Sequence, residues 1–231
     1  MTAGKTIALF VAVFLVALLS LFPMRVALAW FGAGSVVSAR TVSGSVWNSH
    51  WEDARLGVLA LGDADARLDP SFLWTGAGRF HIDSPLSRLT LVRGPATGVE
   101  NATLNLDSTQ LRLPIPTRGA VTLADVTLLF DGARCASASG RIASDMFQVE
   151  WGGPMLSGDL ACDGDRAVAV LTGETDGMAV DMRLYLAADG HYELRTGIAG
   201  VAPPLQDILT RAGFSGDGES LSRLDEGVLG W

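Results

Sequence analysis

Apolar and polar residues alternate with a period of two in several separate stretches of this 231-residue chain. In "MAVDMRLYL" (Met178–Leu186) every second residue is apolar, and "TLNLDS" repeats the pattern with Leu104 and Leu106. Successive side chains of a strand point to opposite faces of a sheet, so this spacing predicts strands with one buried face. The chain is therefore expected to fold mainly as β-sheet, and its 27 glycines fit that expectation better than a helical fold.

Turn signals separate these runs and suggest how the strands connect. Asp189-Gly190 stands between a run that ends at Leu186 and the alternating "HYELRT", which predicts a β-hairpin. Between Val121 and Phe130 the apolar phase shifts once, and a single shift of this kind predicts a β-bulge. Successive hairpins predict a strongly curved antiparallel sheet, which is either open or a partial barrel.

One segment near the C-terminus has helical spacing instead. In "PPLQDILTRAG" the apolar residues Leu205, Ile208, Leu209 and Ala212 recur at i, i+3, i+4 and i+7. This predicts a short amphipathic helix, whose apolar face is expected to cap an open end of the sheet.

The N-terminus begins with a long apolar segment. Residues 6–24 contain no charged residue, and nineteen residues are close to the roughly 20 that span a bilayer as a helix. Lys5 precedes the segment, which favours an N-terminus in the cytoplasm. A cleaved signal peptide is the alternative, because "ALA" at Ala27–Ala29 fits a cleavage site. The expected organisation is a short cytoplasmic tail (1–5), a transmembrane anchor (6–24), a linker (25–40) and an exported β-rich domain (41–231).

Export determines how the two cysteines are interpreted. Cys135 and Cys162 both follow the apolar segment, and an oxidising compartment favours pairing an even number of thiols. The sequence therefore predicts one disulfide, which closes a loop of about 28 residues.

The chain carries little that indicates chemistry. A net charge of −8 leaves no basic surface for nucleic acid. The sequence contains no nucleophile elbow, P-loop or dinucleotide fingerprint. The histidines His50, His81 and His191 are widely separated, so they do not form a metal-binding pattern. We therefore expect no catalytic residue, no metal and no cofactor.

Two tryptophans stand out after the apolar segment, in "GSVWNSHWED" (Gly44–Asp53). Residues four apart share one face of a strand, so Trp47 and Trp51 are expected to anchor the first strand after the membrane segment. The intervening "NSH" either continues that strand or makes a tight turn, and Glu52 with Asp53 is interpreted as a turn. If the Trp47 ring is fully buried, its replacement by alanine should lower the free energy of unfolding by about 3–5 kcal/mol.

The order of these features resembles the type II secretion system protein N family. The resemblance rests on the N-terminal apolar segment, "GSVWNSHW", the strand-turn-strand "LDPSFLWTGAG" (Leu68–Gly78), the cysteine blocks "CASASGRI" and "WGGPMLSGDLACDG", and the tail "ILTRAGF" with "GVLGW". The motif residues to which it assigns a structural role are Gly44, Trp47, Trp51, Leu73, Gly76, Trp151, Gly152, Leu156, Gly158, Gly213 and Phe214.

This resemblance implies an accessory of the machinery that exports folded proteins through the outer membrane of Gram-negative bacteria. The implied partners are other secretion components and the inner membrane, and the implied fold is an AsmA-like periplasmic sheet without catalytic residues. The alternative is a lipid- or apolar-ligand-binding groove. Its lining would include Leu104, Leu106, Met178, Val180 and Met182, and the simpler interpretation makes these residues core.

Overall fold

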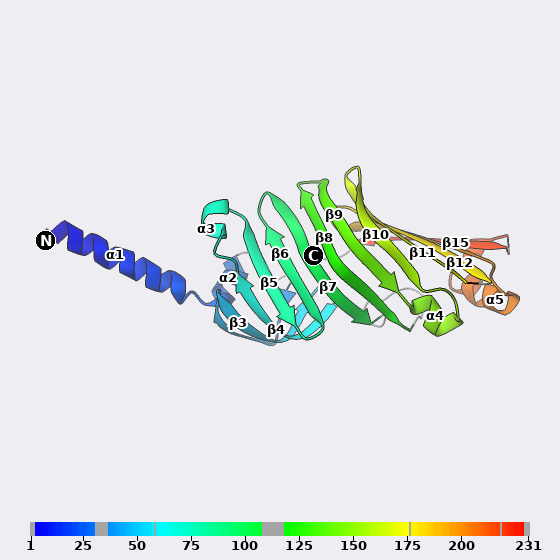
Figure 1. Cartoon of the computed structure of the whole chain (residues 1–231), viewed down its shortest axis with the longest axis horizontal. Helices are drawn as coiled ribbons and strands as arrows, with labels where there is room; N and C mark the ends of the chain where they lie inside the picture. Colours follow the sequence, from blue (N-terminus) through cyan, green and yellow to red (C-terminus); the bar gives the residue numbers. More distant parts are fainter. Residues whose placement is uncertain are drawn as a thin grey trace.

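The computed structural model describes residues 3–30, 37–57, 59–107, 118–175, 177–217 and 219–228. Within them the strands form one 15-stranded antiparallel sheet, and its strand order runs β1-β3-β4-β5-β6-β7-β8-β9-β10-β11-β12-β13-β15-β14, with β2 also paired to β3. The two ends of this order do not pair with each other, so the sheet is open and not a barrel (Figure 1). The prediction of a mainly β, antiparallel fold is confirmed.

The elements follow the chain with short connections. The helices are α1 (Ala3–Ser20), α2 (Met24–Trp30), α3 (Phe72–Thr75), α4 (Met146–Trp151) and α5 (Pro203–Arg211). The strands are β1 (Val37–Ser38), β2 (Thr41–Ser45), β3 (Asn48–Leu56), β4 (Leu59–Leu68), β5 (Gly78–Ser84), β6 (Ser87–Arg93), β7 (Ala96–Asp107), β8 (Ala120–Asp131), β9 (Arg134–Ser144), β10 (Leu156–Asp163), β11 (Arg166–Thr175), β12 (Met178–Leu186), β13 (His191–Ala199), β14 (Ser215–Gly216) and β15 (Ser220–Val228).

Aspartate-glycine pairs connect neighbouring strands as their chemistry predicts. Asp131-Gly132 joins β8 to β9, Asp163-Gly164 joins β10 to β11, and Asp189-Gly190 lies in the predicted hairpin between β12 and β13. These glycines have positive φ, which glycine adopts at low energy. The sheet is consequently a meander from β3 to β13.

Register shifts bend the first part of the sheet. The ladder between β8 and β9 slips between Ala124 and Thr127, which confirms the bulge predicted from the phase shift. Further shifts interrupt the β3–β4, β6–β7 and β7–β8 ladders. Glu52 and Asp53, expected to form a turn, lie inside β3, where Asp53 has a φ of 50° beside the shift. A bulge accommodates the positive φ there without ending the strand, so the turn prediction is wrong.

Two hydrophobic clusters fill the two parts of the sheet. The N-terminal core joins α2 to β3–β8, and the C-terminal core joins α4 and α5 to β10–β15. Ile142 and Leu160 are half-buried and pack against both clusters. The fully or almost fully buried large side chains are Met24, Trp51, Ile82, Leu89, Phe147, Leu156, Ile198 and Leu209.

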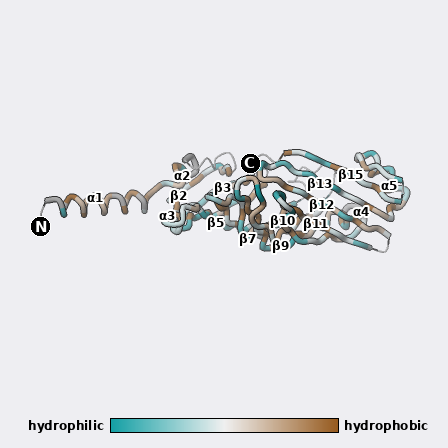
Figure 2. The backbone as a smooth tube through the Cα atoms, turned by 90° about the horizontal axis from the view of Figure 1, so that it is seen from above, coloured by the Kyte–Doolittle hydropathy of each residue, from teal (hydrophilic) through white to brown (hydrophobic). Residues whose placement is uncertain are grey.

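The helix expected over the apolar segment 6–24 ends earlier than expected. Helix α1 ends at Ser20, and Pro23, which has no amide hydrogen, pairs with Ser45 in an isolated β-bridge before α2 begins. Among the described residues, none of the helices combines the length and apolar character needed to cross a membrane. The expected transmembrane helix is corrected accordingly. Figures 1 and 2 show α1 extending away from the sheet.

Helix α2 lies in the segment expected to be a linker. Met24 and Ala27 are buried in the N-terminal core, and Arg25 Nε donates to the Val42 carbonyl at 2.7 Å. These contacts make α2 part of the folded unit. Residues 31–36, between α2 and β1, lie outside the described residues.

The C-terminal helix forms as predicted. Helix α5 contains Leu205 and Leu209, which pack on the C-terminal core, while Ile208 is half exposed. Its apolar side therefore covers one end of the sheet (Figure 1).

Candidate functional site: the core motifs and the two sheet edges

Trp51 is the anchor of the N-terminal core. Its side chain is 1% exposed, and its indole Nε1 donates a hydrogen bond to Ser49 Oγ at 3.0 Å. Ser49 in turn donates to the Ala66 carbonyl of β4 at 2.8 Å. Since each buried polar group has a partner, the ring can be buried without an unsatisfied donor. Trp51 is thus a structural residue.

Trp47 does not share a strand with Trp51. It lies in the turn between β2 and β3, where its half-buried ring packs beside Phe72 of α3 with the ring centroids 6.3 Å apart. The four-residue spacing fits a strand and a tight hairpin equally well, and the chain adopts the hairpin. Strands β1 and β2 also precede β3, so the prediction that both rings anchor the first strand is wrong. The loss of about 3–5 kcal/mol in the free energy of unfolding is expected only for a fully buried ring, and the Trp47 ring is half-buried.

Gly44 is required by the backbone of this hairpin. Its φ is +91°, and a Cβ atom there would overlap the carbonyl oxygen of Asn48. Both observations exclude a larger residue at low energy. The glycine of "GSVWNSHW" therefore sets the close approach of β2 to β3.

The predicted motif glycines at 76 and 152 end short helices. Gly76 follows α3 and Gly152 follows α4, each with a left-handed φ and with its amide bonded to a carbonyl of the helix that it ends. Helix α3 lies inside "LDPSFLWTGAG", which was expected to be a simple strand-turn-strand, so that expectation is corrected. The side chains of Leu73 and Trp151, which the resemblance singles out, lie outside the described residues.

The remaining motif residues lie in the C-terminal half. Leu156 and Phe214 are buried in the C-terminal core. A Cβ atom at Gly158 would overlap the Val170 carbonyl of β11, and Gly213 has a φ of +93° after α5. Leu156, Phe214 and Gly158 therefore serve close packing, and Gly213 allows the chain to reverse after α5.

The predicted disulfide is present between Cys135 and Cys162, whose Cα atoms are 5.7 Å apart. It joins β9 to β10 beyond the ladder of these strands, whose residue pairs extend only from Leu156–Ser144 to Asp159–Arg141. The disulfide thus holds together the part of β9 and β10 that the ladder leaves unpaired.

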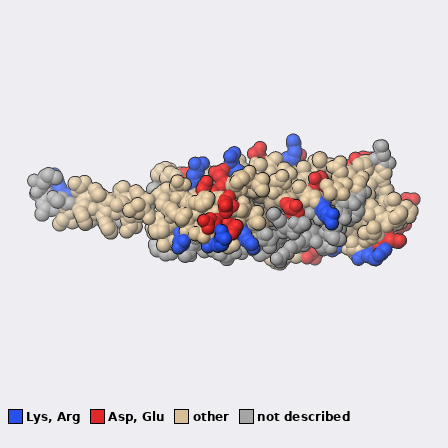
Figure 3. All heavy atoms as spheres, turned by 90° about the horizontal axis from the view of Figure 1, so that it is seen from below, with Lys and Arg blue, Asp and Glu red and all other residues tan. Residues whose placement is uncertain are grey.

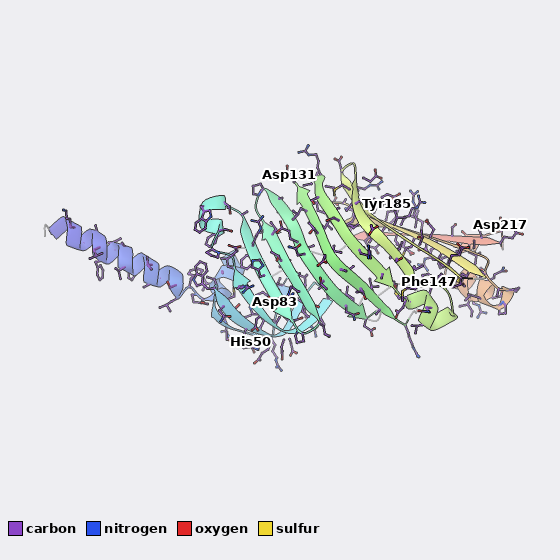
Figure 4. The ribbon with its side chains drawn as sticks, in the orientation of Figure 1. His50, Asp83, Asp131, Phe147, Tyr185 and Asp217 are labelled. Carbon is purple, nitrogen blue, oxygen red and sulfur yellow. A yellow bond between two sulfur atoms is a disulfide. The ribbon has the colours of Figure 1, made fainter. Side chains whose placement is uncertain are left out.

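The three histidines each bind a different neighbour. His50 Nδ1 lies 2.9 Å from Asp65 Oδ1, and this hydrogen bond raises the pKa of His50. His81 contacts the Thr90 hydroxyl at 2.9 Å, and His191 lies beside Asp189. In the described part of the chain, no three potential metal ligands come together. Figure 4 shows how far His50 lies from the C-terminal half, where Tyr185 is labelled.

Two aspartates accept backbone hydrogen bonds that stabilise their charged form. The amides of Ser220 and Glu219 lower the pKa of Asp217, and the amide of His191 lowers that of Asp189. Both aspartates lie in turns beside β-strands, so these shifts belong to turn structure.

Acidic side chains gather on the underside of the N-terminal half (Figure 3). On β3 and β4 they include Glu52, Asp53, Asp63 and Asp65. Arg40 lies 3.2 Å from Asp53 and 3.6 Å from Glu52, and the Asp53 amide donates to Asp63. The patch is therefore partly neutralised by its own neighbours.

The residues expected to line an apolar groove mostly fill the cores. Leu104, Leu106 and Val180 are at most 6% exposed, while Met178 and Met182 are half-buried and pack on the C-terminal core. A separate cleft of about 610 Å³ lies beside α5. Its lining includes Met178 and Ile208, and none of the described lining residues is charged.

The N-terminal edge of the sheet is covered by the chain itself. Arg25 Nε donates to the carbonyl of Val42 in β2, Pro23 bridges to Ser45, and the Val46 amide donates to the Phe22 carbonyl. These contacts occupy backbone groups that an edge strand otherwise leaves free. Sequence reasoning missed this cover, although Pro23 and Arg25 directly follow the apolar segment.

The C-terminal edge differs. Strand β15 pairs with β13 along its whole length, but β14 covers only Leu221 and Ser222 on its other side. No other strand of the described residues pairs with β15, and Leu224 and Val228 are more than half exposed. The sequence predicts an open sheet or a partial barrel, and it does not locate this edge.

Comparison with known proteins gives one similarity. The family model described as Type II secretion system (T2SS), protein N, matches residues 35–219. No curated protein and no solved structure matches the chain. The matched region runs through β14, while α1, α2 and β15 lie outside it.

Proposed function

The chain belongs to the type II secretion system protein N family, and on that premise we propose that it is a non-catalytic accessory component of the secretion machinery. In this proposal it is attached to the inner membrane, and residues 41–231 form one periplasmic domain. The observation that carries the proposal is the family match over residues 35–219, which includes almost the whole sheet. The protein supports export of folded proteins by contacting other components of the machinery.

Membrane attachment through α1 is supported by the surface of that helix. Ile7, Phe10 and Val13 are each more than 60% exposed, and α1 extends away from the sheet. A continuous apolar surface of this kind is unfavourable in water and favours contact with lipid. Replacing Phe10 and Val13 together by aspartate is expected to move the protein from the membrane fraction to the soluble fraction of cells. The matched control Arg88→Gln, on an exposed side chain of β6, should stay with the membrane.

The periplasmic location is supported by the disulfide between Cys135 and Cys162. Disulfides persist in oxidising compartments and are rare in the cytoplasm. We expect a maleimide reagent to label the denatured protein only after reduction. Labelling of both cysteines without a reductant would contradict a periplasmic sheet.

The export role is tested by deleting the gene in its host and measuring the amount of a type II substrate outside the cell. We expect export to fall, and to recover when the full chain or its Arg88→Gln variant is supplied. Crosslinking in the same cells should recover a secretion component. Normal export in the deletion strain, together with crosslinks to no secretion component, would contradict the proposal.

A lipid- or apolar-ligand-binding role is the alternative, and its support is now the cleft beside α5 lined by Met178 and Ile208. The filled cores weaken it, because Leu104, Leu106 and Val180 have no exposed surface to offer a ligand. Native mass spectrometry of the purified full chain distinguishes the two roles, since a ligand carrier should retain a bound lipid.

A further inference from the structure

Alternate residues of β15 direct their backbone amide and carbonyl groups towards β13, and the residues between them direct these groups away from it. The Gly200 amide donates to the Glu219 carbonyl at 3.1 Å, which identifies a hydrogen-bonded pair at the start of the β13–β15 ladder. Bonded and non-bonded pairs alternate along an antiparallel ladder. In the observed register, Arg223, Asp225 and Gly227 therefore direct their backbone groups to β13. The backbone groups that point outward from β15 are those of Ser220, Ser222, Leu224, Glu226 and Val228.

Three of these five outward positions have no partner among the described residues, while the amide of Ser220 donates to Asp217 Oδ1. Ser222 is taken by Ser215 of β14, but Leu224, Glu226 and Val228 lie beyond β14 and pair with no strand of the described residues. An unpaired row of amides and carbonyls is a template for another strand. This edge thus offers three successive donor-acceptor sites, unlike the N-terminal edge that Arg25 and Pro23 cover.

The side chains at the same positions give the edge a chemical pattern. Leu224 is 55% exposed and Val228 is 58% exposed, and both lie on the same sheet face as Glu226 between them. Glu193, which is opposite Glu226 on β13, forms ion pairs with Arg166 and Arg195. No basic side chain of the described residues forms an ion pair with Glu226 itself. The edge therefore presents an apolar-acidic-apolar row with an uncompensated negative charge.

We propose that the outer edge of β15, from Leu224 to Val228, binds an extended segment of another protein as an added strand. The segment carries two apolar side chains that flank a lysine or arginine at alternate positions, because those pair with Leu224, Val228 and Glu226 across the strands. This inference rests on the proposed function, in which the protein acts by contacting secretion components. It also concerns a strand that lies outside the family match.

A second copy of the chain fits this edge less well. The antiparallel two-fold register that uses all three free positions places Leu224 opposite Val228 and Glu226 opposite Glu226. Like charges directly opposite each other are unfavourable. The acidic centre of the row therefore disfavours self-pairing and favours a basic partner.

The test uses the full chain in its own host, with a photoreactive amino acid at Leu224 and a control probe at Val170. Val170 is exposed on the same sheet face, on β11, but is remote from the edge. We expect a crosslink from Leu224 alone, mapped by mass spectrometry to a segment with the apolar-basic-apolar alternation. A product that contains a second copy, residues of the same chain, or a segment without the basic residue would overturn the proposal, and so would no product.

Two variants sharpen the result. Glu226→Lys should lower the crosslink yield at Leu224 by at least about threefold, because an opposite-charge pair becomes a like-charge pair. Glu226→Pro should abolish the crosslink, since it removes an outward amide without removing a bond to β13. The control Glu174→Lys makes the same charge change at an exposed side chain of β11. It should leave the crosslink yield unchanged. Formation of the disulfide shows whether each variant folds. If Glu226→Pro misfolds, the result for Glu226→Lys still tests the proposal.

The outcomes separate this inference from the proposed function. If deletion impairs export but the Glu226 variants leave the crosslink unchanged, only the β15 edge is refuted. If deletion leaves export normal and no secretion component is crosslinked, the proposed function fails as well.

Discussion

The two halves of the sheet differ in the regularity of their strand pairing and in the helices that pack on them. Four of the ladders between β3 and β9 contain register shifts, whereas the ladders from β9–β10 to β14–β15 contain none. Bulges bend strands and increase twist, so the first half can curve over its own core, to which α2 and Phe72 of α3 also contribute. The regular half packs its apolar face against two helices, α4 and α5. Curvature from bulges is therefore a property of the first half, and the described ladders of the second half lack such bulges.

Three of the residues at these shifts also keep a displaced backbone donor hydrogen-bonded. Asp53, Asn101 and Asp125 are the non-glycine residues of the described chain with positive φ, and all three are at register shifts. Their amides leave the ladder and bind side-chain oxygens on the neighbouring strand, which are Asp63 Oδ1, Thr127 Oγ1 and Thr103 Oγ1. The displaced donors therefore stay satisfied.

The largest expected effect tests whether the two halves are one folding unit. Trp51→Ala should lower the free energy of unfolding of the full chain by about 3–5 kcal/mol, because it removes an almost fully buried ring. Since Ile142 and Leu160 contact both cores, we expect amide exchange to accelerate in both halves. Chemical denaturation and hydrogen exchange measure this.

The control for this variant is Trp74→Ala, because Trp74 is 73% exposed and should change stability by less than about 0.5 kcal/mol. Faster exchange confined to β3–β8 would show instead that the halves unfold independently.

The second effect concerns the seam between the halves. Replacing Cys135 and Cys162 by serine should lower stability by about 3 kcal/mol, since the loop that the disulfide closes loses its constraint in the unfolded chain. The β9–β10 ladder has only four residue pairs, so this variant should also separate the unfolding of the halves. Two transitions in place of one are expected by calorimetry, while Ser139→Ala should keep one. A single unchanged transition would show that the ladder alone joins the halves.

The regular half was the easier one to predict from sequence. In β12 the alternation from Met178 to Leu186 is unbroken, and Asp189-Gly190 marks its turn, so strand and hairpin follow directly. The disulfide and α5 were likewise predicted from an even cysteine count and from helical spacing. Pro114 and Pro116 remove backbone donors at alternate positions, which predicts an edge or the end of a strand, and both lie outside the described residues.

The bulged half was harder because its signals are short. Trp51 and buried Ala54 are three residues apart, which is a phase shift, but alanine is too weakly apolar to reveal it. The sequence favours a strand for Trp47 because its hairpin has no aspartate-glycine pair, unlike those between β8 and β9, β10 and β11, and β12 and β13. The cover of the N-terminal edge and the open edge at β15 depend on contacts between distant residues, which periodicity does not encode.

A smaller effect tests the difference between the covered and the open edge. Arg25→Ala removes the bond from Arg25 Nε to the Val42 carbonyl and should lower stability by about 0.5–1.5 kcal/mol. Amide exchange should accelerate in β2 and remain unchanged in β15. The exposed Arg55→Ala, on β3, serves as the control. If β2 keeps its protection, Pro23 and Val46 suffice to cover that edge.

The smallest effect is a pH dependence of opposite sign in the two halves. The pKa of His50 is raised, chiefly by its hydrogen bond to Asp65, so this contribution is complete below about pH 6.5 and is lost as pH rises through the raised pKa. The pKa of Asp217 is lowered by backbone amides, so its contribution is present above about pH 4 and is lost as pH falls through the lowered value.

Both groups are exposed, at opposite ends of the sheet (Figure 4), so each change stays local. Relative to the intrinsic exchange rate at each pH, we expect amide protection to fall at alkaline pH in the β2–β3 hairpin and at acidic pH at Ser220, beside the edge of β15. His50→Gln should remove the first dependence and Asp217→Asn the second, each leaving the other intact. If acid loosens the start of β15, the crosslink at Leu224 should weaken in the same range, since the added strand needs a fixed edge. A crosslink that persists while Ser220 exchanges freely would separate the docking edge from the turn that precedes it.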